Sequence, residues 1–256
     1  MASDLTAKLY QAINEADKPR EIKHWHASSI AKCPRALYFE RKGVPGLPEN
    51  EPGGGKKLRW RGGHAVEAAI RPELEKIYPG LQTNIRMTNP KIDLTGEFDG
   101  YDPVSETLIS VKSTHDFAFI SREGRTGLKK DTGERNARGN KIYTFNENPY
   151  ISHEWQEASY VILSDNENFE IKEIVYIYIT LGGLIDTFRT PVKPEIVKRV
   201  SDKLEYLNKC WADSTLPICL CQPGKEMFDV TDQYCDYRTD ILGVCCSPKL
   251  VEALKK

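Results

Sequence analysis

The chain has 256 residues, of which 39% are hydrophobic and 29% charged, and its formal net charge is −1. These values are ordinary for a globular protein with one large domain, or a domain plus a small appendage, and they exclude an overall basic signature for nucleic acid. No apolar run is long enough to span a membrane, and the N-terminus lacks the apolar core of a signal peptide. We therefore expect a cytoplasmic protein with no membrane partner.

Helices and strands alternate along the predicted order. An N-terminal amphipathic helix precedes a cysteine-bearing helix at residues 29–41, and residues 51–57 form a flexible connection. The next helix, around His64, is expected to break at Pro72. Strands follow at residues 81–87, 91–99 and 108–112. After a basic segment come a helix around Gln156, a strand at 169–181, an amphipathic helix at 193–211 and a cysteine-rich tail.

Residues 96–114 predict two short strands joined by an Asp-Pro turn. Because side chains alternate along a strand, Ser110 and Lys112 project from one face while Ile109 and Val111 face the core. Asp99 closes the first strand, so a carboxylate and a lysine converge at strand ends. In a phosphodiesterase site the carboxylate holds a divalent cation and the lysine orients the attacking water. An ordinary solvent-facing hairpin is the alternative.

Four short motifs follow one another along the chain. They are a histidine at a helix start, a GxxD segment, a lysine near a strand end and a QxxxY pair, carried by His64, Asp99, Lys112, and Gln156 with Tyr160. This order resembles the RecB-like branch of the PD-(D/E)XK nucleases, and most of all the CRISPR-associated and phage exonucleases that carry an iron–sulfur cluster. The resemblance implies an α/β fold with a central mixed sheet flanked by helices.

The resemblance also implies a role for each motif. His64 and Asp99 would ligate Mg²⁺ or Mn²⁺, with the Val111 carbonyl as a further oxygen ligand. Lys112 would position the water, and the QxxxY pair would contact the substrate or support Lys112. The implied activity is a metal-dependent DNA exonuclease or end-processing nuclease acting on ends or single strands. Protein partners in recombination, replication or CRISPR adaptation would fit this activity.

The sequence departs from the family pattern at Ser110, where the family has a metal-binding Glu or Asp. A serine hydroxyl is a poor, neutral substitute for a carboxylate. Three explanations stay open: the chain is naturally impaired, another carboxylate such as Glu67 moves in, or the residue has been altered to silence cleavage. We expect feeble cleavage with Mg²⁺, partial recovery with Mn²⁺ and a large gain from Ser110→Glu.

Seven cysteines are present, one early and six between residues 210 and 246. The early CPRALYFERKG and the late CDYR segments match the iron–sulfur members of the family. The resemblance implies a 4Fe-4S cluster that joins the N- and C-terminal segments. Asp stands at position 232, where many members have a cysteine, so the ligand set includes alternates. It comprises Cys33, Cys221, Cys235 and Cys245, with Cys219 and Cys246 as alternates. Zinc or unrelated thiols are the other interpretations, and disulfides are disfavoured.

Residues 121–141 are basic and glycine-rich, which predicts a long mobile loop that clamps a DNA backbone. A solvated linker is the alternative. Three aromatic residues could stack on the bases of a single strand or belong to the core, namely Trp60, Tyr101 and Phe117. The cations proposed to contact DNA are Arg122, Arg125, Lys129, Lys130, Arg135 and Arg138.

The expected organisation is an N-terminal helical segment with the first cluster cysteine (1–50), a nuclease core (51–190), and a C-terminal helix with the cysteine-rich region (191–256). Two rival functions remain. One is a catalytically inactive DNA-binding or assembly protein of the same fold. The other is an iron–sulfur or zinc protein with a redox or structural role.

Overall fold

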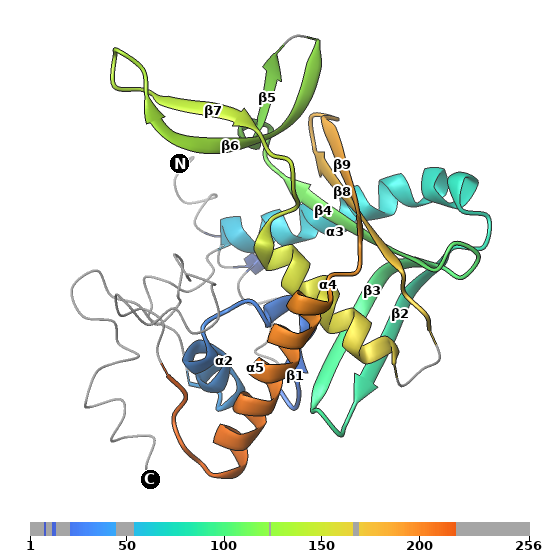
Figure 1. Cartoon of the computed structure of the whole chain (residues 1–256), viewed down its shortest axis with the longest axis vertical. Helices are drawn as coiled ribbons and strands as arrows, with labels where there is room; N and C mark the ends of the chain where they lie inside the picture. The colour runs from blue at the N-terminus through green and yellow to red at the C-terminus, as the bar shows by residue number, and fades with distance from the viewer. Residues whose placement is uncertain are drawn as a thin grey trace.

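The computed structural model describes residues 8, 12–13, 21–44, 54–122, 124–165 and 169–218 (Figure 1). A six-stranded mixed sheet forms its centre, and β2 (Gln82–Asn89) pairs with β3 outside the main strand order. That order is β1 (Trp25–His26), β3 (Leu94–Asp102), β4 (Thr107–Thr114), β8 (Glu173–Thr180) and β9 (Ile185–Pro191). The β1–β3 and β4–β8 pairs are parallel, and the others are antiparallel.

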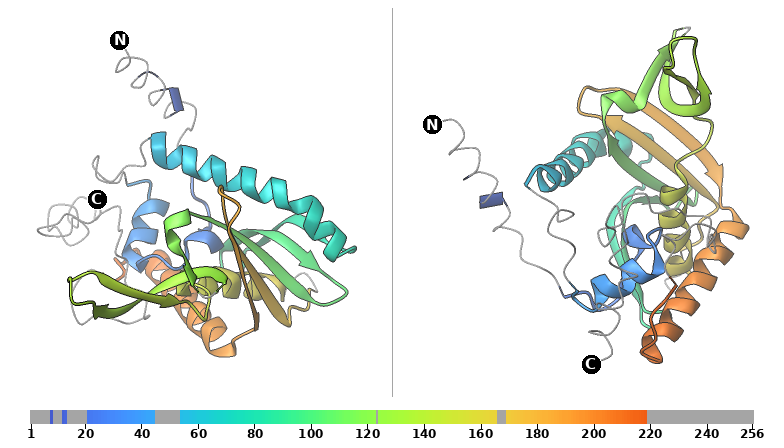
Figure 2. Two further views of the ribbon diagram at one scale, coloured as in Figure 1. Left: turned by 90° about the horizontal axis from the view of Figure 1, so that it is seen from above. Right: turned by 90° about the vertical axis from the view of Figure 1, so that its left-hand side faces the viewer.

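Helices cover both faces of this sheet (Figures 1 and 2). Helix α3 (Gly54–Ile77) packs on one face through a cluster made by Leu74, Ile109, Val175 and Ile177. Helices α4 (Ile151–Ser164) and α5 (Pro194–Ala212) pack on the other face, in the main core with Leu108, Ile174, Tyr176, Trp155 and Leu204. The alternation of β4 therefore divides its side chains between two helical layers. None of the helices in the described ranges is long and apolar enough to cross a membrane.

Shorter elements complete the described chain. Helix α2 (Pro34–Arg41) and the 3-10 turn η1 (Ala27–Ser29) lie near the N-terminal end. Proline at the first helical position starts α2, so Cys33 precedes the helix. The expected cysteine-bearing helix is thus shorter than predicted. The predicted N-terminal helix and the cysteine-rich tail fall largely or wholly outside the described residues.

A separate three-stranded sheet projects from the body. It contains β5 (Phe119–Arg122), β6 (Arg125–Arg135) and β7 (Lys141–Phe145), after the 3-10 turn η3 (Asp116–Ala118). We call these three strands the arm, and Figure 1 shows them standing clear of α4 and α5. The prediction of a long mobile loop at 121–141 is therefore wrong. Polar strands without apolar alternation resemble a loop in sequence, but cross-strand pairing and the buried Leu128 order them.

Two further expectations, both for helix α3, are corrected. Helix α3 continues through Pro72 despite the lost backbone hydrogen bond, because buried Val66 and Leu74 hold the turns on either side against the molecule. The helix also begins at Gly54, inside the expected flexible connection. Strand β9 was not predicted, because its IDTFRTP sequence buries only Phe188. The other predicted strands, and the helices around Gln156 and at 193–211, are confirmed to within a few residues.

Candidate active site

The central sheet splits along one edge of β3. Strand β2 pairs along almost the whole of the opposite edge. On the split edge, β1 pairs with Leu94 and Thr95, and β4 pairs only with residues 100–102. Residues 96–99 thus have no strand partner on this edge, and β4 diverges after Ile109. We call this opening the fork. A gap of this kind leaves backbone polar groups without the hydrogen bonds of a continuous ladder, so they and the nearby polar side chains can bind other partners.

Asp99 spans the fork. Its Oδ2 accepts a hydrogen bond of 2.8 Å from the Val111 backbone N–H, in place of the missing ladder bond. Within a strand, the N–H and C=O of one residue point to the same edge, so the Val111 carbonyl also faces the fork. The sequence-predicted Asp99, Val111 and Lys112 are therefore brought together. The Lys112 Nζ lies 3.9 Å from the Asp99 Oδ2.

Glu157 of α4 joins these residues, although sequence reasoning did not select it. Its Oε1 lies 3.0 Å from the Lys112 Nζ and accepts a 2.6 Å hydrogen bond from the Ser110 hydroxyl. The Glu157 side chain is 1% exposed. Ser110, where a carboxylate was expected, thus holds a carboxylate from the neighbouring helix. An acidic residue on the buried face of an amphipathic helix, directly after the glutamine of QxxxY, was the signal that could have identified it.

Electrostatic coupling dominates this group. Burial alone would lower the pKa of Lys112, but the carboxylates of Glu157 and Asp99 outweigh it, so the pKa is raised and the ammonium persists at neutral pH. Burial raises the pKa of Glu157, and Lys112 offsets this only in part. Burial and the Lys112 charge lower the pKa of His153 to about 3. Its neutral ring lies 2.8 Å from the Tyr178 hydroxyl.

The QxxxY pair lies on the same helix as Glu157. The Gln156 amide donates a 2.9 Å hydrogen bond to the Tyr160 hydroxyl, as i,i+4 spacing allows. Tyr160 is buried against Phe98 of β3, with ring centroids 4.9 Å apart. A β-carbon at Gly96 would lie 2.5 Å from the Tyr160 ring, so only glycine lets α4 approach the fork this closely.

Helix α3 brings His64 and Glu67 to the other side of the fork. The His64 Nδ1 lies 3.9 Å from the Glu67 Oε2, and the His64 side chain is 83% exposed. Glu67 is near enough to raise the pKa of Lys112. A β-carbon at Gly63 would lie 2.9 Å from the Ser113 hydroxyl, which shows how closely α3 crosses β4. His64 lines the same cleft as Asp99, and in the described part of the chain no hydrogen bond or ion pair joins it to Asp99 or Lys112.

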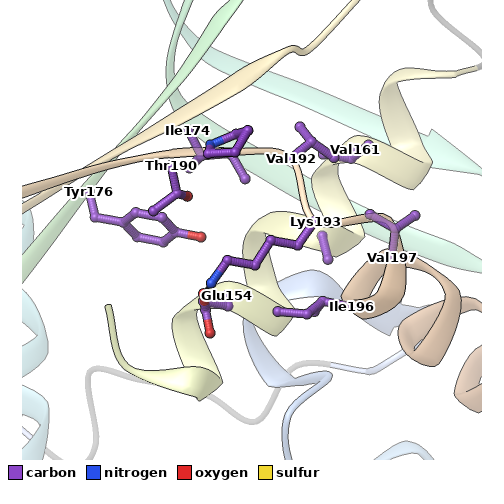
Figure 3. Close-up of a pocket in the computed structure, with 11 residues that line it drawn as sticks. Glu154, Val161, Ile174, Tyr176, Thr190, Val192, Lys193, Ile196 and Val197 are labelled. Carbon is purple, nitrogen blue, oxygen red and sulfur yellow. Dashed lines mark hydrogen bonds and ion pairs between the residues drawn. The ribbon is translucent and has the colours of Figure 1, made fainter. Parts of the chain in front are cut away.

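A cleft of about 510 Å³ opens beside the fork. Residues from α3, β2, β3 and α4 line it, including His64, Glu67, Arg86, Asp99 and Tyr160. A volume of this size suits a nucleotide-sized ligand. A second hollow, between α4, β8, β9 and the start of α5, is shown in Figure 3. It holds only about 10 Å³, room for about one water, and its walls are mainly aliphatic around the Lys193–Glu154 ion pair.

The donor set at the fork suits a hard cation in part. Among the described residues, no group of three or more His, Cys, Asp and Glu side chains is gathered closely enough to hold an ion. Two carboxylates, Asp99 and Glu157, do converge on one ammonium. Mg²⁺ commonly binds through one or two carboxylates and keeps several waters. At the fork, the oxygen donors available to such a cation are the two carboxylates, the Val111 carbonyl and water.

Of the six cysteines predicted as cluster ligands or alternates, only Cys33 lies within the described residues. Its thiol is buried, and its Sγ lies 3.9 Å from the backbone oxygen of Ile218. The Arg35 Nε also donates a 2.7 Å hydrogen bond to the Pro217 oxygen. The start of α2 thus contacts the segment that leads directly into Cys219 and Cys221 in the sequence. The cations Arg122, Arg125, Lys129, Lys130 and Arg135 lie on the arm, and Arg138 lies in the turn between β6 and β7; all six are outside the fork.

Comparison with known proteins gives similarity of structure alone. No family model matches the chain, and no curated protein matches it in sequence. Among solved structures, an alkaline exonuclease from Laribacter hongkongensis, LHK-Exo, matches at a TM-score of 0.50 and 10% identity, covering 81% of this chain and 93% of its own.

Two other matches lie below a TM-score of 0.5. The structure of LHK-Exo in complex with dAMP has a TM-score of 0.46 and 11% identity, over 81% of this chain and 93% of that one. The protein SSO0001 has a TM-score of 0.46 and 14% identity, over 90% of this chain and 97% of its own. The match to LHK-Exo at a TM-score of 0.50 supports the architecture described above. The chain has an α/β fold with a mixed central sheet, and this fold resembles that of an alkaline exonuclease.

Proposed function

We propose that this protein is a metal-dependent deoxyribonuclease of the RecB-like PD-(D/E)XK type, which processes DNA ends. One observation carries the proposal: Asp99 and Glu157 converge on the Lys112 ammonium where the sheet splits, beside a cleft. Buried ionisable groups are costly even when they are paired, so Lys112 and Glu157, gathered with Asp99 of the cleft wall, mark a candidate functional site. The similarity of fold to an exonuclease supports the same reaction class.

In this proposal each group has a separate task. Asp99, Glu157 and the Val111 carbonyl would hold a Mg²⁺ or Mn²⁺ ion, which would polarise the phosphate and lower the pKa of a bound water. Lys112 remains protonated and aligns the attacking water or stabilises the charge that develops on the phosphate. Ser110 positions Glu157 by donating its hydroxyl proton. His64 and Glu67, across the cleft, complete the outer part of the cation's surroundings.

Other groups in the cleft suit a nucleic-acid substrate. Arg86 of β2 is exposed and lines the cleft together with Asp99, so it can neutralise a phosphate of the bound strand. Gln156 and Tyr160 form a hydrogen-bonded pair on α4, and they would contact the substrate or hold α4 against the fork. The seven Lys and Arg residues between 119 and 145 add sequence-independent attraction to the backbone.

The proposal includes a 4Fe-4S cluster ligated by Cys33 and three cysteines of the tail, and a cytoplasmic location. The contacts of Cys33 and Arg35 with Ile218 and Pro217 support the cluster, because they bring the early cysteine to the chain segment that precedes the late ones. A cluster there would join the two ends of the chain through thiolates. Zinc in the same position remains an outcome that metal analysis would distinguish.

Cleavage of end-labelled DNA with Mn²⁺, Mg²⁺ or EDTA tests the proposal. The unmodified chain should release labelled nucleotides with a divalent cation and none with EDTA. Asp99→Asn and Lys112→Met preserve side-chain size and should each lower the rate about a hundredfold or more. Lys76→Met, which removes an exposed ion pair with Glu73 on α3, is the matched control and should cut normally.

Binding measurements separate this function from its rival. An inactive DNA-binding or assembly protein of the same fold would shift DNA in EDTA but release no nucleotides with either metal. Cleavage that persists in both Asp99→Asn and Lys112→Met would show that the fork is not the active site. If the chain neither binds nor cleaves DNA, a structural or redox role is the function that remains.

A further inference from the structure

The arm carries a face of aromatic and cationic side chains that the proposed chemistry does not use. Along β7, Tyr143 and Phe145 are two residues apart and so project from one face. Lys129 pairs directly opposite Phe145 and so shares this face. Phe117 of η3 lies nearby, with the Lys129 Nζ 5.9 Å from its ring centroid. We call Phe117, Tyr143 and Phe145 the arm rings.

Each ring lies next to a cation. The Lys129 Nζ is 4.6 Å from the Tyr143 ring centroid, and the Arg125 guanidinium is 4.6 Å from the Phe145 ring. Phe117 is 71% exposed and stacks on His115, with ring planes 11° apart. Large apolar side chains at such exposure usually mark an interaction site when they occur together. Here Phe117 is the exposed ring, and Tyr143 and Phe145 are half-buried beside it on a sheet that projects from the main body (Figures 1 and 2).

The charge of the arm selects the kind of partner. Residues 119–145 contain seven Lys and Arg against three Asp and Glu, whereas the whole chain has a net charge of −1. A polyanion is therefore attracted to the arm and not to the molecule at large. Aromatic rings beside such cations suit a polyanion whose bases are free to stack.

The spacing of the rings then favours a single strand over a duplex. Residues two apart in a strand are separated by about 6.8 Å, twice the base-pair rise of about 3.4 Å in duplex DNA. Bases inside a duplex also have both faces covered. An extended single strand can place successive bases on rings at this spacing while its phosphates take the neighbouring cations. A base stacked on a ring outweighs an exposed cation–π contact, so this exchange is favourable.

We propose that the arm rings form a stacking platform for single-stranded DNA. The protein would thus act on ends that carry a single-stranded extension, which the arm holds while the fork cuts. This inference deepens the proposed nuclease function and rests on it for its use. Asp186 of β9 accepts a 2.9 Å hydrogen bond from the Leu128 backbone N–H and so anchors the arm at its base.

Fluorescence anisotropy of the full chain in EDTA tests the platform without cleavage. The probes are a labelled oligo-dT and a blunt duplex of equal length, each titrated at several salt concentrations. Phe117→Ala/Tyr143→Ala should weaken oligo-dT binding about tenfold or more and change duplex binding little. The slope of log affinity against log salt should stay unchanged, because the phosphate contacts remain. The control Phe117→Tyr/Tyr143→Phe keeps both rings and should bind normally.

A second pair of variants separates stacking from charge. Arg125→Gln/Lys129→Gln should weaken both probes and flatten the salt slope. Equal loss of both probes in the ring variant would make the arm a purely electrostatic clamp and overturn the proposal. A ring variant that binds both probes normally but loses a concentration-dependent dimer in sedimentation would overturn it in favour of self-association. Phe117→Ala alone serves if the double variant unfolds.

The two proposals can fail independently. Loss of oligo-dT binding in the ring variant would support the platform even if Lys112→Met showed that the chain never cuts. The converse result is also possible. Cleavage would depend on Lys112, but the unmodified chain and the ring variant would both cut blunt and single-stranded ends at equal rates. That result would support the nuclease and overturn the platform.

Discussion

At the scale of single residues, the fork explains how a serine can occupy the position of an expected carboxylate. Ser110 is 1% exposed and donates its proton to Glu157, so the missing acid is replaced from α4 and not from α3. Glu67, the alternative considered from sequence, affects Lys112 only as its weakest contributing charge. One interpretation therefore requires the Glu157 carboxylate for cleavage, and the other requires the Glu67 carboxylate.

A reciprocal exchange tests this substitution. Glu157→Gln should lower cleavage about a hundredfold or more, because it removes an anionic oxygen ligand. Ser110→Glu/Glu157→Ser returns the carboxylate to the strand and should recover much of the rate. Rates with Mg²⁺ and Mn²⁺ on end-labelled DNA give the comparison.

The single variant Ser110→Glu has a different expectation from the one based on sequence. It would place a second carboxylate against buried Glu157, so it should lower stability and raise the pKa of the pair without a large gain in rate. Ser110→Ala, which removes only the hydrogen bond, is the mild control. Full activity in Glu157→Gln together with loss in Glu67→Gln would reverse the assignment.

At the scale of elements, close approach between helix and strand builds the site, and two glycines allow it to different degrees. A β-carbon at Gly96 would meet the rigid Tyr160 ring at 2.5 Å and the Ala27 side chain at 2.9 Å. A β-carbon at Gly63 would meet only the Ser113 side chain, and the close atom is the hydroxyl at 2.9 Å, which can rotate away. The Tyr160 ring beside Gly96 cannot move away unless α4 also moves.

Gly96→Ala should therefore destabilise the protein by about 1–3 kcal/mol through overpacking. For a chain of this size, that corresponds to a melting temperature lower by about 2–4 °C per kcal/mol. Gly63→Ala is the matched control and should be near neutral, since alanine also favours the helix. Thermal unfolding by circular dichroism compares the two. Equal melting temperatures would mean that Tyr160 is free to move from β3.

Local signals explain what the sequence could predict of these elements. The Asp-Pro turn between β3 and β4 and the apolar periodicity of α4 place the residues Asp99, Lys112 and Gln156 on the right elements. The fork was not predictable, because the two-residue β1 is too short to show a period. The meeting of Glu157 with Ser110 depends on how α4 is rotated over β4, which is a tertiary property. The arm was missed because its strands are polar on both faces for most of their length.

At the scale of the whole molecule, the two ends of the described chain are held together. Lys203 of α5 is fully buried, and its ammonium donates hydrogen bonds to the Ile30 and Lys32 backbone oxygens at 2.6 and 2.5 Å. The Trp25 indole donates to the Asn208 side chain at 2.6 Å. The Ile218 N–H donates to the Tyr206 hydroxyl at 2.8 Å, next to Cys33. A cluster on Cys33 would add a covalent closure to contacts that already exist.

Substitution of single cysteines tests that closure. If Cys33 ligates an iron–sulfur cluster, the protein purified without oxygen should be brown, and Cys33→Ser should remove both the colour and the bound iron. It should also lower the melting temperature, because metal–thiolate binding contributes directly to folding. Cys210→Ser is the matched control: Cys210 is also buried, but it lies outside the proposed ligand set, so its variant should keep colour and iron. Bound zinc without iron in the unmodified protein would replace the cluster with a structural zinc site. Metal-free protein whose stability responds equally to both substitutions would leave Cys33 as a packed thiol, with α5 joined to residues 30–32 by Lys203.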